Sequence, residues 1–136
     1  MIKWAGWIIT LSGIAHTVGA LTVQKAGRHA GTWFSGGLWN EDLADMSPAG
    51  SAYWLSLESF GIPLTLVGLT VLWLDRRGIA PPAFIVWTLS AWTVVDAVVL
   101  PFTPWPLFAL ACALLFIGAR RARRDDPAPE AGLPRA

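Results

Sequence analysis

The chain has 136 residues, of which 54% are hydrophobic and 14% are charged, and its formal net charge is +1. Soluble domains average about 25% charged residues, so this chain has too little polar surface to be an ordinary soluble domain. The near-neutral charge also gives no indication of nucleic-acid binding.

Four apolar runs account for this composition: Trp4–Val23, Ala49–Leu74, Ala80–Leu100 and Pro104–Ala119. A bilayer core of about 30 Å requires roughly 20 helical residues, with a lower limit near 17. The first three runs meet that length and the fourth is at its short end. We therefore predict an all-α, four-helix transmembrane bundle over residues 1–120, with helices near 4–23, 49–74, 81–100 and 104–119 and an outer loop at 24–47. The Pro-rich, polar segment 121–136 is predicted to be a disordered tail.

Basic residues predict the orientation of the bundle in the membrane. Four spans place the amino end, the second loop and the tail on one side, which carries Lys3, Arg76, Arg77, Arg120, Arg121, Arg123 and Arg124. The other side carries only Lys25 and Arg28. Both termini are therefore expected in the cytoplasm, with the protein a multi-pass component of the inner (plasma) membrane. The RRARR stretch at 120–124 can attract anionic lipid head groups, but a positive-inside anchor already explains it.

Two further features leave alternatives open. The first run resembles a signal-peptide core ending at Val18-Gly19-Ala20, although a single lysine precedes it and the apolar run continues past that point. The outer loop is long for a compact protein, so it is either a lid or a plain tether. Trp39, Leu43 and Met46 in this loop recur at helical spacing, which predicts a short helix on the membrane surface.

Three ionisable side chains lie within the apolar runs: His16, Glu58 and Asp96. At about 1.5 Å per residue they are roughly 18, 24 and 21 Å from the inner helix ends, so we expect them to converge in the outer half of the membrane. Ser59 and Thr93 are the neighbouring hydroxyl groups in this predicted polar centre. Intramembrane ionisable residues are rare and are usually partnered or functional.

Small residues share helix faces with these polar groups. They repeat at steps of three and four in the first run (Gly6, Thr10, Gly13, Thr17, Ala20) and in the second run (Glu58, Gly61, Thr65, Gly68). Small residues let membrane helices approach closely, and hydroxyls bond across them. Pro63 removes the helical bond to the Ser59 carbonyl and predicts a kink beside Glu58.

The chemistry of this centre is open between three readings. The polar residues either bind or transport a small molecule or proton, or they only fasten the helices together in a structural or partner-binding membrane subunit. A third alternative is an acid–base enzyme for a lipophilic substrate, with Glu58 or Asp96 as the acid and His16 as the base. One histidine and two carboxylates make a weak metal site, and we predict no cofactor and no metal. The expected partners are the lipid bilayer and a small lipophilic ligand, and the sequence is compatible with a homo-oligomer.

Four stretches of the chain resemble a family of small four-helix actinobacterial membrane proteins. They read WAGWIITLSGIAHTVGAL, HAGTWFSGGLW, MSPAGSAYWLSLESFGIPLTLVGLTVLWLDRRG and PPAFIVWTLSAWTVVDAVVLP. The resemblance covers about residues 2–120 and implies the fold and the membrane location. That family is of unknown function, so the resemblance implies no catalytic residues. A looser likeness is to DoxX-like and sterol-isomerase-like membrane bundles, of which the latter place His and acidic residues in an intramembrane cavity.

Overall fold

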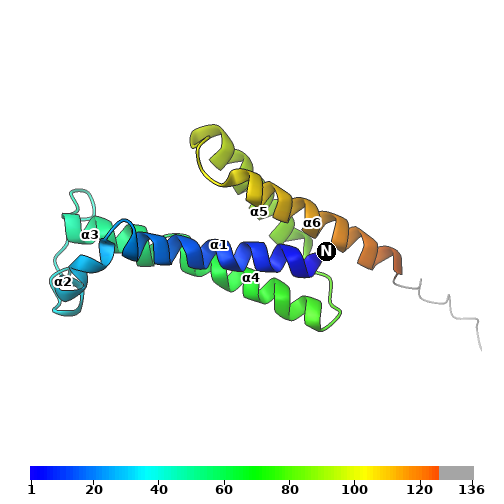
Figure 1. The fold of residues 1–136 in the computed structure, drawn as a ribbon, viewed down its shortest axis with the longest axis horizontal. Coiled ribbons are helices and arrows are strands. Elements are labelled where there is room, and N and C mark those ends of the chain that lie inside the picture. The colour runs from blue at the N-terminus through cyan, green and yellow to red at the C-terminus, as the bar shows by residue number, and fades with distance from the viewer. Residues whose placement is uncertain (126–136) are drawn as a thin grey trace, which may run out of the picture. The chain divides into compact units, whose positions relative to one another are not determined.

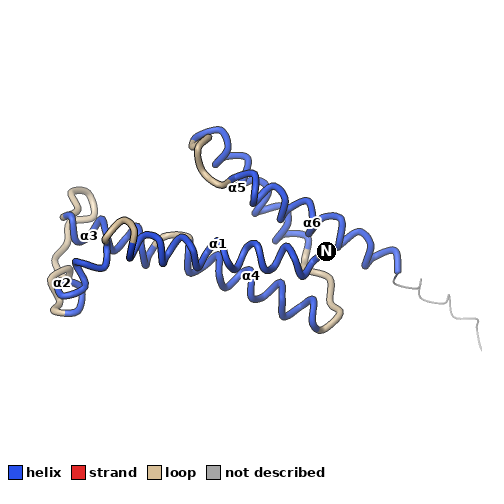
Figure 2. The backbone as a smooth tube through the Cα atoms, viewed as in Figure 1, coloured by secondary structure: helices blue, strands red, loops and turns tan. Residues whose placement is uncertain are grey.

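Helices make up the regular structure of the described chain. The computed structural model describes residues 1–125, and its elements are α1 (Ile2–Thr22), η1 (Ala26–His29), α2 (Ala30–Phe34), α3 (Pro48–Tyr53), the π-helix η2 (Trp54–Glu58), α4 (Gly61–Arg76), α5 (Ala83–Val99) and α6 (Trp105–Asp125) (Figures 1 and 2). The predicted all-α class is confirmed for this part of the chain.

The chain divides into two compact units. The first unit is Gly6–Thr70, and the second unit is Met1–Ala5 together with the chain from Val71 onward.

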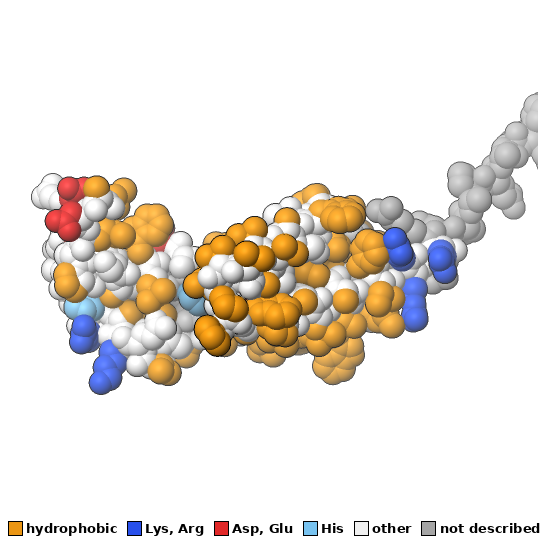
Figure 3. Space-filling view, turned by 90° about the horizontal axis from the view of Figure 1, so that it is seen from above, with side chains coloured by type: hydrophobic (Ala, Val, Ile, Leu, Met, Phe, Trp, Pro, Cys, Tyr) orange, Lys and Arg blue, Asp and Glu red, His pale blue; other side chains and the backbone are white. Residues whose placement is uncertain are grey.

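Three helical segments are long and apolar enough to cross a membrane: Ile2–Thr22, Pro48–Arg76 and Trp105–Ala122. α5 is also apolar but has only 17 residues. Large apolar side chains are exposed on these helices, among them Trp4 at 68%, Leu66 at 65% and Val98 at 77%, and hydrophobic side chains cover much of the visible helix surface (Figure 3). Exposed apolar area on this scale is unfavourable in water, so it indicates association with a membrane.

Within the first unit, α1 and α4 pack with their backbones in contact. A Cβ atom added at Gly13 would lie 2.5 Å from the carbonyl oxygen of Gly61 and 2.7 Å from the amide nitrogen of Thr65. A Cβ added at Gly68 would lie 2.5 Å from the amide nitrogen of Thr10. Thr10 lies against Gly68, whereas Gly13, further along α1, lies against the earlier residue Gly61 of α4. The two helices therefore run antiparallel. The predicted small-residue faces are confirmed at Thr10, Gly13, Gly61, Thr65 and Gly68, since only glycine permits so close an approach. Glu58, which was predicted to share the second face, lies before the start of α4.

Within the second unit, α5 and α6 form an antiparallel pair. Trp92 packs edge-on against Phe108 at 5.4 Å between ring centroids, and Trp87 packs against Phe116 at 6.3 Å. The short connection at 100–104 makes this arrangement the natural one for neighbouring helices.

The predicted helix ends agree with the structure to within one or two residues, with two exceptions. The second apolar helix is not continuous, because it is interrupted at Ser59 and Phe60. The last helix was predicted to end at 119 but continues through Asp125, so residues 121–125 are helical rather than part of a disordered tail. Alanine and arginine are strong helix formers, and no Gly or Pro follows Gly118 until Pro127. The rest of the predicted tail, 126–136, lies outside the described residues.

The outer loop differs from its prediction. Trp39–Met46 forms turns rather than a helix, and the helical turns lie earlier, at η1 and α2. The Asp42 carboxylate accepts a hydrogen bond from the Ala44 amide at 2.9 Å, a local turn that competes with helix formation. The loop is fastened to the start of the second apolar helix, because Trp33 Nε1 donates to the Ala49 carbonyl at 2.9 Å.

Candidate functional site

The second apolar helix is broken in the middle, and this break organises the candidate site. α3 continues into the π-helix η2, which ends at Glu58, and Ser59 then adopts an extended backbone with ψ −171° before α4 begins at Gly61. Pro63 is the third residue of α4, in the first turn, where a backbone N–H would have no helical partner. The predicted kink is therefore a complete interruption. π-helical turns are rare and occur frequently at functional sites.

His16 of α1 binds at this break. Its Nε2 atom lies 2.8 Å from the Ser59 hydroxyl oxygen and 3.1 Å from the Leu55 carbonyl oxygen. The Ser59 hydroxyl also donates to the Leu55 carbonyl at 2.7 Å. Carbonyls in the last turn of a helix lack helical partners, and here the side chains of Ser59 and His16 both contact the Leu55 carbonyl.

This geometry favours a proton on one particular ring nitrogen of His16. A carbonyl oxygen can only accept hydrogen bonds, and the single proton of the Ser59 hydroxyl is directed to the Leu55 carbonyl. The contacts of Nε2 are therefore favourable only if Nε2 carries a proton and donates it. The negative end of the helix dipole at this break favours the same arrangement.

The opposite ring nitrogen, Nδ1, is left for other chemistry. Among the described side chains, Thr17 Oγ1 is the one buried polar atom without a hydrogen-bond partner. Nδ1 of the half-buried His16 ring is therefore not a buried atom that lacks a partner, and it is open to its surroundings. The ring is held in place by Phe60, with centroids 4.0 Å apart, and by Gly61, where an added Cβ would lie 3.1 Å from His16 Cδ2. His16 is thus a fixed imidazole that presents one nitrogen.

Thr17 is a site residue that the sequence analysis assigned only to helix packing. Its hydroxyl would touch a Cβ added at Gly61, so Thr17 and His16 flank the same glycine. An apolar groove of about 400 Å³ runs beside it, lined by Ile14, Thr17, Val18, Ile62, Thr65, Leu66 and Leu69. A buried hydroxyl without a partner is energetically unfavourable, and no sequence signal separates Thr17 from the other small residues of its face.

Glu58 does not bind His16 in this structure. Its side chain is exposed and lines a second hollow of about 180 Å³ with Leu38, Glu41, Leu43, Gly50, Tyr53 and Trp54. Glu41 is itself engaged, because its carboxylate accepts from the Ser47 amide at 2.5 Å. The recorded partners of the His16 ring are Ser59 and the Leu55 carbonyl rather than Glu58, so the predicted convergence of Glu58 with His16 stays a prediction. Ser59 contacts His16 in this structure, and it does so through its side-chain hydroxyl rather than through the backbone carbonyl that Pro63 was predicted to free.

Asp96 and Thr93 belong to the second unit, so their predicted convergence with His16 stays a prediction. Asp96 lies in the last turn of α5, where its Oδ2 atom accepts from the Thr103 hydroxyl at 2.7 Å. Thr93 is buried, donates to the Leu89 carbonyl at 2.7 Å and lies 4.0 Å from Cys112 Sγ. Both residues thus have local structural partners at the α5–α6 pair.

Among the described residues, no three His, Cys, Asp or Glu side chains are grouped closely enough to hold a metal ion. What the first unit offers chemically is a hydrogen-bond acceptor or base at His16 Nδ1 and an apolar groove with the unpartnered Thr17 hydroxyl buried beside it.

Comparison with known proteins gives a family but no activity. Neither the curated proteins nor the solved structures contain a match to this chain. One family model, a family of unknown function (DUF6463), matches residues 1–123, which confirms the expected membership in a family of unknown function. The chain therefore belongs to the DUF6463 family.

Proposed function

We propose that this chain is a multi-pass protein of the bacterial inner membrane that crosses it four times, with both termini in the cytoplasm. Three helical segments have the required length, and α5, with 17 residues, is at the lower limit for a span. The excess of arginine and lysine on one side of the four predicted spans supports this orientation.

The site at His16 binds a proton or a small lipophilic molecule. The observation that carries this proposal is the fixed imidazole at the helix break, with Nε2 held by Ser59 and the Leu55 carbonyl. When one ring nitrogen donates to the backbone, the other is set as an acceptor or base. Broken helices at membrane depth are tolerated where they are buried in protein or line a cavity, and in many transporters they form the substrate or ion site.

The groove beside Thr17 supports a lipophilic ligand. Its volume of about 400 Å³ is within the usual range for small-molecule sites, and its lining residues are apolar apart from Thr17 and Thr65. A molecule with an apolar body and one polar group would fill the groove and supply the partner that the Thr17 hydroxyl lacks.

The test compares the wild-type protein with His16→Gln in proteoliposomes. His29→Gln is the matched control, because His29 is the only other histidine and lies in the outer loop. Proton flux would be followed with an internal pH dye, and small molecules that copurify from native membranes would be identified by mass spectrometry. We expect His16→Gln to lose the flux or the bound molecule and His29→Gln to retain it.

Two results would reject this function in different ways. If the wild type and His16→Gln show equal flux and equal bound molecules while His16→Gln unfolds at a lower temperature, His16 only fastens helices. If the copurified molecule is chemically converted by the wild type and not by His16→Gln, the protein is an enzyme.

A further inference from the structure

The cytoplasmic end predicted for α6 carries a group of arginines that the proposed function does not use. The sequence at 120–126 is RRARRDD, and basic side chains gather where the described chain ends (Figure 3). Arg120, Arg121 and Arg124 form no ion pair with a side chain that the structure describes, and all three are exposed. These charges are therefore available to an anionic partner.

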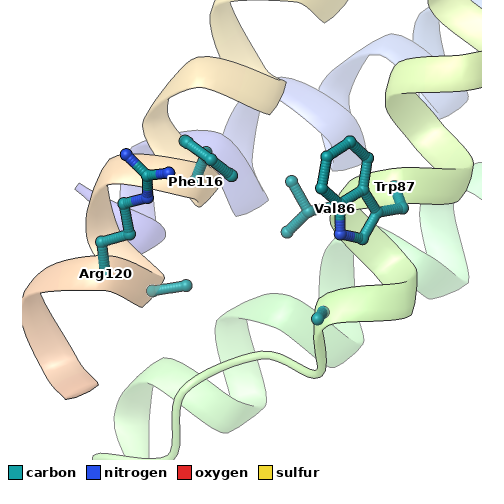
Figure 4. A pocket seen from close by; sticks show the side chains of 6 residues that line it. Val86, Trp87, Phe116 and Arg120 are labelled. Atoms are coloured by element: carbon teal, nitrogen blue, oxygen red, sulfur yellow. The ribbon is translucent and has the colours of Figure 1, made fainter.

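An apolar hollow lies directly beside these arginines. It has a volume of about 310 Å³ and is lined by Ala83, Val86, Trp87, Phe116, Ala119 and Arg120. Val86 and Trp87 of α5 and Phe116 of α6 project around it, with Arg120 at its edge (Figure 4). A second hollow of about 230 Å³ adjoins it, because Phe116 and Arg120 line both, and its other lining residues are Ile117, Arg121 and Arg124.

Arg120 connects the apolar and the basic parts. Its guanidinium carbon lies 4.0 Å from the centre of the Phe116 ring. A cation–π contact of this kind uses no N–H group, so the donors of the guanidinium remain available for two-pronged binding of a phosphate. An apolar surface that ends in three arginines matches a molecule with a hydrocarbon body and an anionic phosphate head.

We propose that the α5–α6 pair binds one anionic phospholipid. Its phosphodiester is held by Arg120, Arg121 and Arg124, and an acyl chain lies in the hollow between Trp87 and Phe116. Charge complementarity and the continuity of the two hollows identify the occupant. Juxtamembrane arginines attract anionic lipids generally, and the adjoining hollow turns that attraction into a site for a single lipid. The site belongs to the second unit and does not depend on the function proposed for His16.

The test uses the full chain in nanodiscs that contain phosphatidylglycerol or phosphatidylcholine, followed by native mass spectrometry of the released protein. The variant is Arg120→Gln/Arg124→Gln. Its control is Arg76→Gln/Arg77→Gln, which removes the same charge at the end of α4, where neither arginine lines either hollow. We expect the wild type and the control to retain phosphatidylglycerol in preference to phosphatidylcholine. The variant should bind phosphatidylglycerol more weakly by about fivefold for each arginine removed.

A second variant tests the acyl-chain part of the site. Ala83→Phe fills the apolar hollow from an exposed position and leaves every arginine in place, so it should reduce phosphatidylglycerol retention without changing the helix content in circular dichroism. Inorganic phosphate added alone should not raise the unfolding temperature. The proposal is overturned if the wild-type protein retains both lipids equally, or if Arg76→Gln/Arg77→Gln loses as much lipid as Arg120→Gln/Arg124→Gln. It is also overturned if Ala83→Phe does not reduce phosphatidylglycerol retention, or if phosphate alone stabilises the protein as phosphatidylglycerol does.

Discussion

The Ser59 hydroxyl oxygen lies 2.8 Å from Nε2 of His16, although the two residues are 43 positions apart in the chain. This contact ties α1 to the break in the second apolar helix. It also leaves Nδ1 of the same ring as the group that can accept a proton or a hydrogen bond from a ligand. The stability of the first unit and the chemistry of its candidate site therefore depend on the same few residues.

The close crossing of α1 and α4 predicts a strong effect of adding a single methyl group. Gly68→Ala places a Cβ 2.5 Å from the Thr10 amide nitrogen, so the helices must separate, and we expect a loss of about 1–3 kcal/mol in the free energy of unfolding. Gly19→Ala is the matched control, because an added Cβ there meets no atom within 4 Å. That variant should be neutral or slightly stabilising, since alanine favours helix over glycine. Chemical denaturation in detergent measures both, and an equal loss in the two variants would contradict the crossing.

Part of this fold could be predicted from the sequence, and the reason is physical. Small residues at steps of three and four identify a helix face, and Gly68 lies against Thr10 while Gly13 lies against Gly61, as expected. The break at Ser59 could not be predicted in full. Pro63 indicates that a helical bond is lost, but whether a helix bends or restarts depends on side chains from another helix, here His16.

The candidate site was predicted only in part for a similar reason. His16 and Ser59 do meet, but depth along a helix does not state in which direction a side chain points. Glu58 is next to Ser59 in sequence, yet it lines a different hollow, which the outer-loop residues Leu38 and Leu43 also line. Asp96 was predicted to point from the outer half of its helix toward His16, and its recorded side-chain bond is to Thr103, beyond the end of α5 at Val99.

The bond between Asp96 and Thr103 predicts a structural role at the α5–α6 turn. The Thr103 hydroxyl lies within hydrogen-bond distance of both Asp96 Oδ2 and the Leu100 carbonyl. A hydrogen bond contributes about 0.5–1.5 kcal/mol net, so Asp96→Ala and Thr103→Val should each lower the free energy of unfolding by an amount of this order. Because the two side chains bond to each other at 2.7 Å, the double variant should cost clearly less than the sum of the single ones. Additive losses in this double-mutant cycle would show that Asp96 has a different partner.

The outer loop should be held in place by Trp33. Its Nε1 atom donates to the Ala49 carbonyl at 2.9 Å, and its ring packs edge-on against Tyr53 at 5.6 Å. Trp33→Phe removes the donor, so we expect faster amide hydrogen exchange in residues 26–47. Trp39→Phe is the control, because that side chain is 89% exposed and its replacement should leave exchange unchanged. Equal exchange in Trp33→Phe and the wild type would mean that the loop is a free tether.

The protonation of His16 tests the central claim most directly. In His29→Gln protein labelled with 15N-histidine and placed in a bilayer, all histidine signals come from His16. The contacts with Ser59 and the Leu55 carbonyl predict that Nε2 carries a proton and that Nδ1 of the neutral ring does not. The shift of Nδ1 alone should change when a ligand or proton binds. A neutral ring with its proton on Nδ1 and a bare Nε2 would contradict the account, because Nε2 would then face the Leu55 carbonyl with no proton to donate.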